Sequence, residues 1–297
     1  MQLYHFPFHA MGTACDLQLY ADNSIDAQRV ASIVIDDISR LESKYSRYLD
    51  NSLLARINST AINGGSIKVD EETAGLLDYA QTCYLESEGL FDITSGLLRQ
   101  AWNFKSGQLP RTSEINILLE KIGWNKLVWE KPMLSFPSPG MELDFGGVVK
   151  EYAADRAATL SKEAGINHGI INLGGDIRII GPHPDSSPWK VGIKHPQEQE
   201  SVLEMLELSE GALASSGDYE RCITIDNVRY GHVLNPLTGW PVRTLAAVSV
   251  VADLCVVAGS ASTIAMLREE AGKAWLKDLG LAHAWVDVDG KTGGNLN

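Results

Sequence analysis

The sequence contains few cysteines and no cluster of basic residues. Its four cysteines lie far apart and form no Cys-x-x-Cys pair: Cys15, Cys83, Cys222 and Cys255. This spacing does not suggest a zinc site. We expect reduced, buried thiols, with two disulfides as the alternative that spacing leaves open. The net charge of −13 makes nucleic acid a poor partner, because phosphate backbones are bound by basic surfaces.

Long apolar runs are missing as well. No run approaches the roughly 20 residues that a membrane-spanning helix needs. Residues 1–9 contain neither the basic region nor the long apolar region of a signal peptide. From these absences we expect a soluble, cytoplasmic protein without a membrane span.

The residues that are present are typical of a globular α+β protein. The 297 residues are 44% hydrophobic and 21% charged, which is enough for a large core. Apolar residues recur at helical spacing over 27–45 and 71–87. Short strand-like segments then follow one another from 169 to 234, which favours antiparallel strands over alternating βα units. We expect an antiparallel sheet core flanked by helices. Residues 1–297 would form one domain, undivided or built from two closely packed subdomains with the ligand cleft between them.

The boundaries of the remaining elements follow from periodicity and from glycine stop signals. Further helices are predicted within 49–58, up to 164, and over 255–268 and 271–279. Strands are predicted over 11–20, 126–136, 169–173, 177–180, 189–193, 202–208, 221–225, 229–234, 246–252 and 282–288.

One stretch, Leu143 to Asp155, has the features of an anion-binding site. It begins as a strand, breaks at Gly146 and Gly147, and continues as a helix with Lys150 in its first turn. Paired glycines let the backbone approach a ligand, and the unpaired N–H groups of a helix N-terminus favour anions. The alternative is an ordinary strand–helix joint with a solvated lysine.

Four more segments combine glycine with polar residues. They are 11–13, 89–94, 172–176, and 215–221 together with 231–239. Each one alone has the composition of a turn, and Asp176 and Asp218 have the pattern of turn residues after glycine. Their number favours a function, because loops on a rigid scaffold commonly carry binding residues.

Taken together, these motifs resemble the FAD:protein FMN transferase family, the ApbE-like proteins. The resemblance extends from about residue 8 to residue 290 and rests on the order Met11-Gly-Thr, Ser46-Arg-Tyr, Phe91-Asp-Ile-Thr, Leu143-Asp-Phe-Gly-Gly-x-x-Lys, Asn172-Leu-Gly-Gly-Asp, Ser215-Ser-Gly-Asp-Tyr-Glu-Arg and His232-Val-Leu-Asn-Pro. It implies a T-fold-related architecture. It also implies Mg²⁺-dependent cleavage of the FAD pyrophosphate, transfer of FMN to a Thr or Ser hydroxyl of a target flavoprotein, and release of AMP.

The resemblance also implies roles for individual residues. Lys150 and His232 are the expected catalytic residues, and the Gly147 carbonyl and Thr263 are the expected metal ligands. The expected contacts to the flavin nucleotide are Met11, Tyr48, Leu90, Phe91, Asp92, Asp144, Lys150 and His232. Histidine suits the removal of a hydroxyl proton because it titrates near neutral pH. A strand histidine that bonds the Asn235–Pro236 turn is the alternative for His232, and a core position is the alternative for Tyr48.

The sequence departs from the family pattern where the metal is expected. The family carries an aspartate four residues before the threonine, and Gly259 stands there before Thr263. Ser260 is about 100° further around the helix and cannot simply replace the aspartate. Asp253 precedes the helix and could only swing in. A hard dication prefers charged oxygen, so we expect weak Mg²⁺ binding, and Gly259→Asp is expected to raise activity.

Two smaller departures accompany this one. Glu151 replaces the usual glycine after the lysine, and Asn235 replaces the usual aspartate of the His-x-x-Asp-Pro turn. Glu151 could donate a carboxylate near the metal, but we expect it to point to solvent from the first helical turn. Three functions remain open: a flavin transferase with a weakened metal site, a non-catalytic FAD-binding protein, and a metal-dependent FAD pyrophosphatase.

Overall fold

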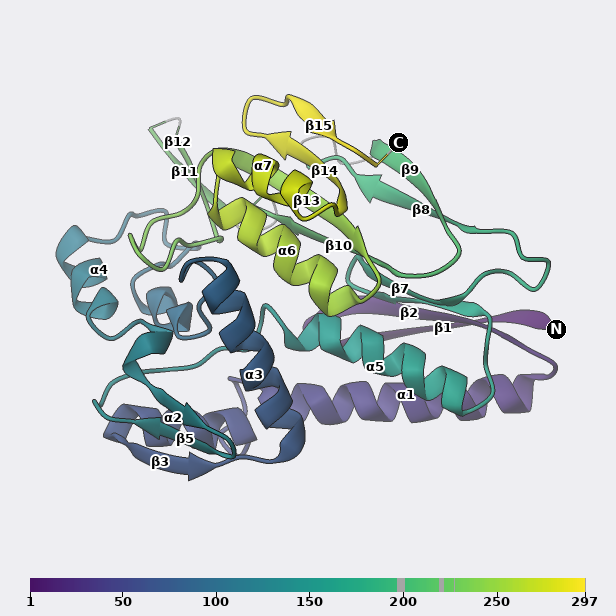
Figure 1. Ribbon diagram of the computed structural model, residues 1–297, viewed down its shortest axis with the longest axis horizontal. Coiled ribbons are helices and arrows are strands. Elements are labelled where there is room, and N and C mark those ends of the chain that lie inside the picture. The colour runs from purple at the N-terminus through teal and green to yellow at the C-terminus, as the bar shows by residue number, and fades with distance from the viewer. Residues whose placement is uncertain (197–200, 219–221, 227, 297) are drawn as a thin grey trace.

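The computed structural model describes residues 1–196, 201–218, 222–226 and 228–296 (Figure 1). Its centre is an eight-stranded sheet with the strand order β1-β2-β6-β7-β10-β13-β14-β15. Each pair of neighbours is antiparallel. The strands are β1 (Gln2–Ala10), β2 (Thr13–Ala21), β6 (Gly169–Leu173), β7 (Asp176–Gly181), β10 (Ala212–Gly217), β13 (Leu245–Ala252), β14 (Ala282–Asp287) and β15 (Thr292–Gly294). The expected antiparallel α+β architecture is therefore confirmed.

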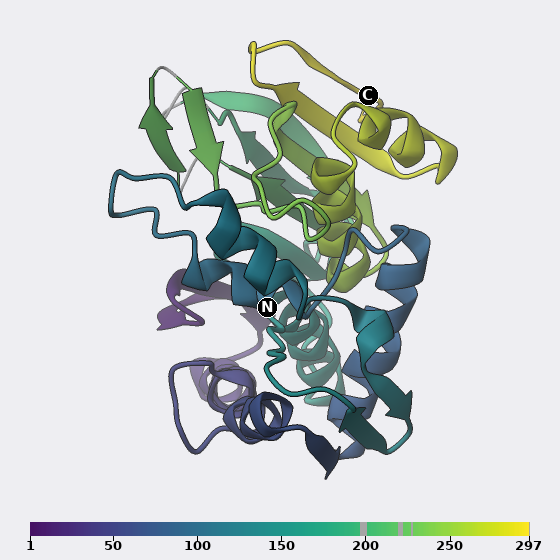
Figure 2. The same ribbon diagram turned by 90° about the vertical axis from the view of Figure 1, so that its left-hand side faces the viewer.

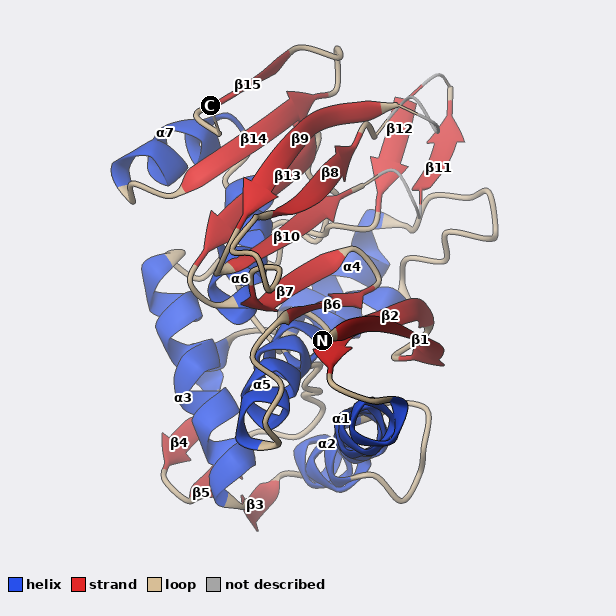
Figure 3. Ribbon diagram, turned by 90° about the vertical axis from the view of Figure 1, so that its right-hand side faces the viewer, coloured by secondary structure: helices blue, strands red, loops and turns tan. Residues whose placement is uncertain are grey.

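Helices cover one face of this sheet, as Figures 1 and 3 show. They are α1 (Ser24–Tyr45), α5 (Val149–Glu163), α6 (Cys255–Leu267) and α7 (Glu270–Asp278). Leu17 and Leu19 of β2 are fully buried, as are Val34 and Leu41 of α1. Burial of such side chains contributes about 1.5–3 kcal/mol each, so this layer is the main source of stability.

The opposite face of the sheet packs against a hairpin. The hairpin consists of β8 (Trp189–Lys194) and β9 (Val202–Leu208), which pair antiparallel. Trp189, Val191 and Ile193 alternate with exposed residues and pack with Ile177 and Ile179 of β7. The period of two places these three side chains on one side of the strand, which explains how a short hairpin closes the second layer.

A long insertion separates β2 from β6, although these two strands pair in the sheet. It contains α1, α2 (Leu53–Asn63), α3 (Glu71–Glu86), α4 (Thr112–Leu119), α5 and the small sheet β3 (Gly65–Lys68), β5 (Met133–Phe136) and β4 (Val128–Glu130). Figure 2 shows its 95–122 region against the hairpin β11 (Cys222–Ile225) and β12 (Val228–Gly231), where Leu98, Ile115 and Ile223 share a cluster. The insertion thus faces the C-terminal strands across the site described below.

Most of the predicted elements are present. Helix α1 begins after Asn23, whose side chain accepts a hydrogen bond from the Asp26 N–H at 3.0 Å, as expected of an N-cap. Strands β1, β3, β10 and β15 and helix α4 were not predicted from the sequence. The expected strand at 229–234 ends at Gly231, and Arg221 and Asn227 of the expected hairpin lie outside the described residues. No disulfide joins the cysteines in the described part of the chain, and Cys222 is only partly buried, whereas Cys15, Cys83 and Cys255 are buried.

None of the helices in the described part of the chain has the length and apolar character required to cross a bilayer. The longest one, α1, is amphipathic: its buried residues recur on one side and include Ala27, Val30 and Ile38. This pattern is typical of a helix packed against a protein core.

The carboxylate of Glu72 joins three helices. Arg40 of α1 donates two hydrogen bonds of 2.8 Å to it, Lys44 donates a third at 2.8 Å, and the Tyr152 hydroxyl of α5 lies at 3.3 Å. The Arg40 hydrogen bond is the largest cause that holds the pKa of Glu72 at about 2, below its ordinary value of 4.5. The ionised form therefore stabilises the fold above the ordinary pKa, and this contribution is lost as the pH falls toward 2.

Glu72→Gln is expected to lower the free energy of unfolding by about 1 kcal/mol at neutral pH, the size expected for partly screened ion pairs. The difference from wild type should shrink as the pH falls below the ordinary glutamate pKa. Urea unfolding at neutral pH and at about pH 3 measures both effects. The matched control is Glu71→Gln, because the Glu71 side chain is 86% exposed. Equal losses for both variants would contradict the prediction.

Candidate functional site

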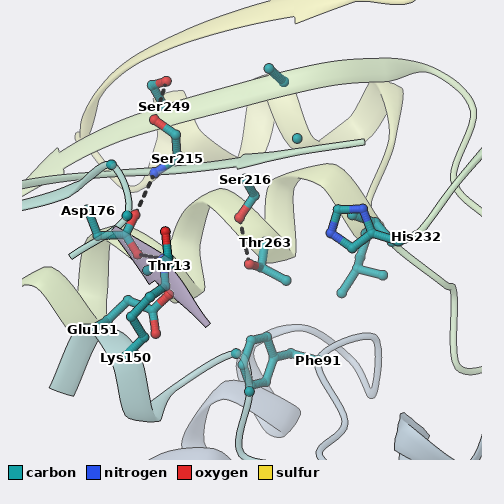
Figure 4. Close-up of a pocket in the computed structure, with 18 of the residues that line it drawn as sticks. Thr13, Phe91, Lys150, Glu151, Asp176, Ser215, Ser216, His232, Ser249 and Thr263 are labelled. Carbon is teal, nitrogen blue, oxygen red and sulfur yellow. Dashed lines mark hydrogen bonds and ion pairs between the residues drawn. The ribbon is translucent and has the colours of Figure 1, made fainter. Parts of the chain in front are cut away.

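A cavity of about 840 Å³ lies between the insertion and the sheet. We call it the central cavity. It falls within the roughly 300–1,000 Å³ of ligand sites. Its walls come from the 90–96 loop, the start of α5, the turn before β7, strand β10, the segment after β12, and α6. Figure 4 shows the labelled side chains around it, with Lys150, Glu151 and Asp176 grouped together and Phe91 and His232 further away.

Eight of the ten residues expected to form the site line this cavity: Leu90, Phe91, Asp92, Asp144, Gly147, Lys150, His232 and Thr263. The two others lie elsewhere. Met11 has a left-handed backbone with φ 52° and donates its N–H to Glu42 at 2.7 Å. Tyr48 is 80% exposed, so the alternative of a core tyrosine is wrong. The structure therefore brings together residues that are far apart in sequence.

Lys150 and Asp176 form an ion pair at the base of the cavity. The second Asp176 oxygen accepts the Ser215 N–H at 3.3 Å. Burial disfavours the ammonium, but Asp176 and then Glu151 outweigh it, so the pKa of Lys150 is raised. Asp176 is buried within β7 rather than placed in a solvated turn, and the expectation from its glycine neighbours is wrong. Asp218 is also buried and pairs with Arg229 at 3.1 Å.

Glu151 does not point to solvent, which corrects the expectation from its position in the helix. It is only 8% exposed and lines the central cavity. Its Oε2 has no hydrogen-bond partner among the described residues. Burial, reinforced by the Asp176 carboxylate, raises the pKa of Glu151. The sequence could not show this, because the burial depends on α6, which packs against α5.

The space for Glu151 exists because residue 259 is glycine. A Cβ at Gly259 would lie 2.6 Å from Glu151 Cγ and 3.2 Å from Oε1. Ser260 is turned away, with its hydroxyl 2.6 Å from the Tyr79 hydroxyl, and Asp253 is exposed and absent from the cavity wall. Neither residue stands in for a carboxylate at position 259. The carboxylate that packs there belongs to Glu151.

Hydroxyl groups form the neighbouring part of the wall. Ser216 Oγ of β10 lies 2.8 Å from Thr263 Oγ1 of α6. His232 lines the same cavity, and Figure 4 places it on the far side of Thr263 from Glu151. Asn235 bonds its own turn instead of the cavity, accepting from the Leu237 N–H at 2.9 Å. The wall thus offers hydroxyl oxygens and an imidazole beside the charged group.

Two further carboxylates line the cavity, and both already have partners. Asp144 pairs with the guanidinium of Arg47, which also lines the cavity and donates to the Tyr48 hydroxyl at 3.0 Å. Asp92 accepts the Thr94 N–H at 2.8 Å and the Trp124 N–H at 2.9 Å. These hydrogen bonds hold the loop that carries Phe91 in place. The described contacts of Asp92 are therefore structural.

The sequence did not single out Arg47, Ser216 or the buried state of Glu151. Arg47 lies in a Ser-Arg-Tyr motif, which was a usable signal, and Ser216 lies in the Ser-Ser-Gly-Asp motif. The sequence predicts a turn at Gly174, but it does not predict the close contact that also requires glycine there. Its φ is 65°, and a Cβ there would lie 2.5 Å from the Thr13 hydroxyl oxygen. That contact requires the pairing of β2 with β6, which no local pattern reveals.

A family model described as the ApbE family matches residues 11–285. The FAD:protein FMN transferase of Vibrio cholerae is 28% identical over 278 residues, covering 91% of this chain and 83% of that protein. The protein of the same name from Escherichia coli K12 is 26% identical over 280 residues, covering 90% of this chain and 80% of that protein.

Solved structures agree with this result. The ApbE protein of Thermotoga maritima superimposes with a TM-score of 0.89 at 31% identity, covering 99% of this chain and 97% of that one. The flavin transferase ApbE of Vibrio cholerae gives a TM-score of 0.88 at 26% identity, with the same coverage. The family match extends over nearly the whole chain, and the fold is shared over 99% of it. The chain therefore belongs to the ApbE family.

Proposed function

We propose that this protein is an FAD:protein FMN transferase, which moves FMN from FAD to a Thr or Ser hydroxyl of a target flavoprotein and releases AMP. The observation that carries the proposal is the central cavity, where residues from all seven motifs converge: Thr13, Arg47, and residues within 90–96, 144–151, 172–176, 215–217 and 232–234. Relatives that carry this name match most of the chain.

The reaction requires stabilisation of charge on the pyrophosphate. The acceptor hydroxyl oxygen attacks the FMN phosphorus, and the bond from that phosphorus to the bridging oxygen breaks, so that AMP leaves with the electron pair. Lys150, which lines the cavity from the first turn of α5, is the described cation suited to this charge. His232 is proposed to take the hydroxyl proton, since histidine titrates near neutral pH in general.

The donors in this wall fit a magnesium ion. They are oxygens of mixed kinds, which Mg²⁺ prefers, and the buried Glu151 Oε2 has no partner in the described part of the chain. No group of three or more His, Cys, Asp and Glu side chains suited to a metal occurs among the described residues. A carbonyl and a hydroxyl would therefore take part, and we propose Gly147 and Thr263. The bound ion would neutralise phosphate charge.

The function is tested by incubating the protein with FAD and Mg²⁺, with and without the protein substrate of the Vibrio cholerae relative as acceptor. Released AMP is measured by chromatography, and covalent flavin is measured by fluorescence of the denatured acceptor. AMP release that needs the acceptor, with fluorescent acceptor formed, is the expected result. AMP and FMN without acceptor would indicate a pyrophosphatase instead. Intact FAD throughout would indicate a binding protein. Either of these two results overturns the proposal.

A further inference from the structure

We propose that Glu151, at the start of α5, supplies the carboxylate of the divalent-cation site in the central cavity, and that Gly259 of α6 is the space that admits it. The site would combine the Glu151 carboxylate with the Thr263 hydroxyl and the Gly147 carbonyl. This inference rests on the proposed function only for the role of the cation in cleaving FAD. The existence of the site stands on the contacts of Glu151.

The first observation is a buried oxygen without a partner. Glu151 is 8% exposed, and its Oε2 receives no hydrogen bond from the described residues. A buried carboxylate is costly unless it is paired or coordinates a metal. Glu151 also lines the cavity, so an ion that enters the cavity can reach it.

The second observation is that the nearest cation is already engaged. Lys150 is paired with Asp176, and the other Asp176 oxygen accepts the Ser215 N–H at 3.3 Å. Lys150 therefore compensates Asp176 first. Among the described residues that line the cavity, the carboxylates outnumber the cations by one: Asp92, Asp144, Glu151 and Asp176 against Arg47, Lys150 and Lys194. A divalent ion removes this imbalance, which a neutral ligand cannot do.

The third observation concerns the other two proposed donors, the Thr263 hydroxyl and the Gly147 carbonyl. Gly259 and Thr263 are four residues apart on α6, so they share one face of the helix. The Glu151 carboxyl group packs at Gly259, with a distance of 3.1 Å from Cδ to a Cβ built there, and hence lies one helical turn from Thr263. Gly147 lies just before α5. Among the described residues, no backbone N–H in a turn, loop or cap donates to the Gly147 carbonyl, so this oxygen can serve as a ligand.

Binding of Mn²⁺ tests this assignment without any measurement of turnover. The full chain is titrated with Mn²⁺ alone, and again with AMP present, and free Mn²⁺ is followed by electron paramagnetic resonance. Wild type is expected to bind one ion per chain. Glu151→Gln is expected to weaken binding at least about tenfold, because a charged ligand is replaced by a neutral one. Glu151→Asp keeps the charge on a shorter side chain and should lie between the two.

A matched control is Glu142→Gln, since Glu142 is also buried, at 6% exposure, but pairs with Arg99 away from the cavity wall. This variant should bind Mn²⁺ like wild type. Thermal unfolding in EDTA provides a second readout. Glu151→Gln should melt at or above the wild-type temperature, because it removes a buried acidic group whose Oε2 lacks a partner among the described residues, and it should lose the Mn²⁺-induced rise in melting temperature.

Three results would overturn the inference: no Mn²⁺ binding by wild type, equal affinities for wild type and Glu151→Gln, or the same Mn²⁺-induced thermal shift in both. Failure of the proposed function looks different. A protein that binds Mn²⁺ through Glu151 but releases no AMP with the acceptor would contradict the transferase and leave the metal site intact. An active transferase whose Mn²⁺ affinity is unchanged in Glu151→Gln would support the proposed function and contradict the metal site.

Discussion

Gly259→Asp lowers AMP release and Mn²⁺ affinity by about 10-fold or more, although it adds a carboxylate to the cavity wall. This expected result reverses the one drawn from the family pattern alone. The reason is steric: the new Cβ would lie 2.6 Å from Glu151 Cγ, in the middle of that side chain rather than at its flexible end. Glu151 must leave its position, and two buried carboxylates then compete for one cation.

Removing the Glu151 side chain and adding an aspartate at position 259 in the same protein is expected to restore the cation site. Glu151→Gly alone deletes the carboxylate and should weaken Mn²⁺ binding as Glu151→Gln does. The double variant Glu151→Gly/Gly259→Asp places a carboxylate on α6 with space around it, and should recover activity to within about tenfold of wild type. The two positions would thus be strongly non-additive, because each substitution is harmful only while the other position is unchanged.

The control for this pair is Glu151→Gly/Gly259→Ala, which fills the same space without a carboxylate and should remain inactive. AMP release in the presence of acceptor and the Mn²⁺ titration are measured on all variants. A rise in activity for Gly259→Asp alone would show that position 259 lacks a ligand in wild type and would refute the role given to Glu151. Equal activity of the Asp and Ala double variants would refute it as well.

Lys150→Met is expected to have the largest effect on stability, about 3 kcal/mol, together with at least about a hundredfold loss of AMP release. Asp176 is 3% exposed, and its partner is Lys150. Without the ammonium, Asp176 and Glu151 are two buried acidic groups with no other ion-pair partner among the described residues. Breaking a buried pair from one side leaves an uncompensated charge, which costs more than the pair itself contributes.

The double variant Lys150→Met/Asp176→Asn separates the two effects. It removes both charges of the pair, so urea unfolding should show most of the lost stability regained, while AMP release stays low. Lys162→Met is the matched control, because Lys162 is exposed on the same helix, and it should change neither quantity. Recovery of activity together with stability would mean that Lys150 acts only as a structural partner of Asp176.

The helices and the glycine-rich loops could be predicted because their signals are local. The spacing of Ala27, Val30 and Ile38 and the Asn23 cap are sufficient for α1. Strand β10 could not be predicted, because its residues, Ala212–Gly217, are alanines, serines and one leucine before a glycine. Neighbours on both sides, β7 and β13, make it a strand, which is tertiary context overriding a weak propensity.

The same distinction applies to the site. Motifs identified the loops that meet in the cavity, because each motif is contiguous in sequence. The orientation of Glu151 was missed, since a first-turn residue of α5 is buried only if another element covers it. Gly259 of α6 leaves that space, and α5 and α6 pack together. Gly259 and Glu151 are both departures from the family pattern. In the sequence they are unrelated, but in the structure the Glu151 side chain occupies the space that Gly259 leaves.

The separation of β2 from β6 in sequence bears on how the protein folds. Residues 22–168 lie between these paired strands, and bringing the ends of so long a loop together costs entropy that the native contacts must offset. The central cavity is lined both by residues of this loop, such as 90–96 and 144–151, and by residues that follow it, such as 172–176 and 215–217. A dinucleotide that touches both sets of residues would bind the closed chain alone and shift the equilibrium toward it. Flavin supply would then raise the folded fraction of the protein in addition to feeding its reaction.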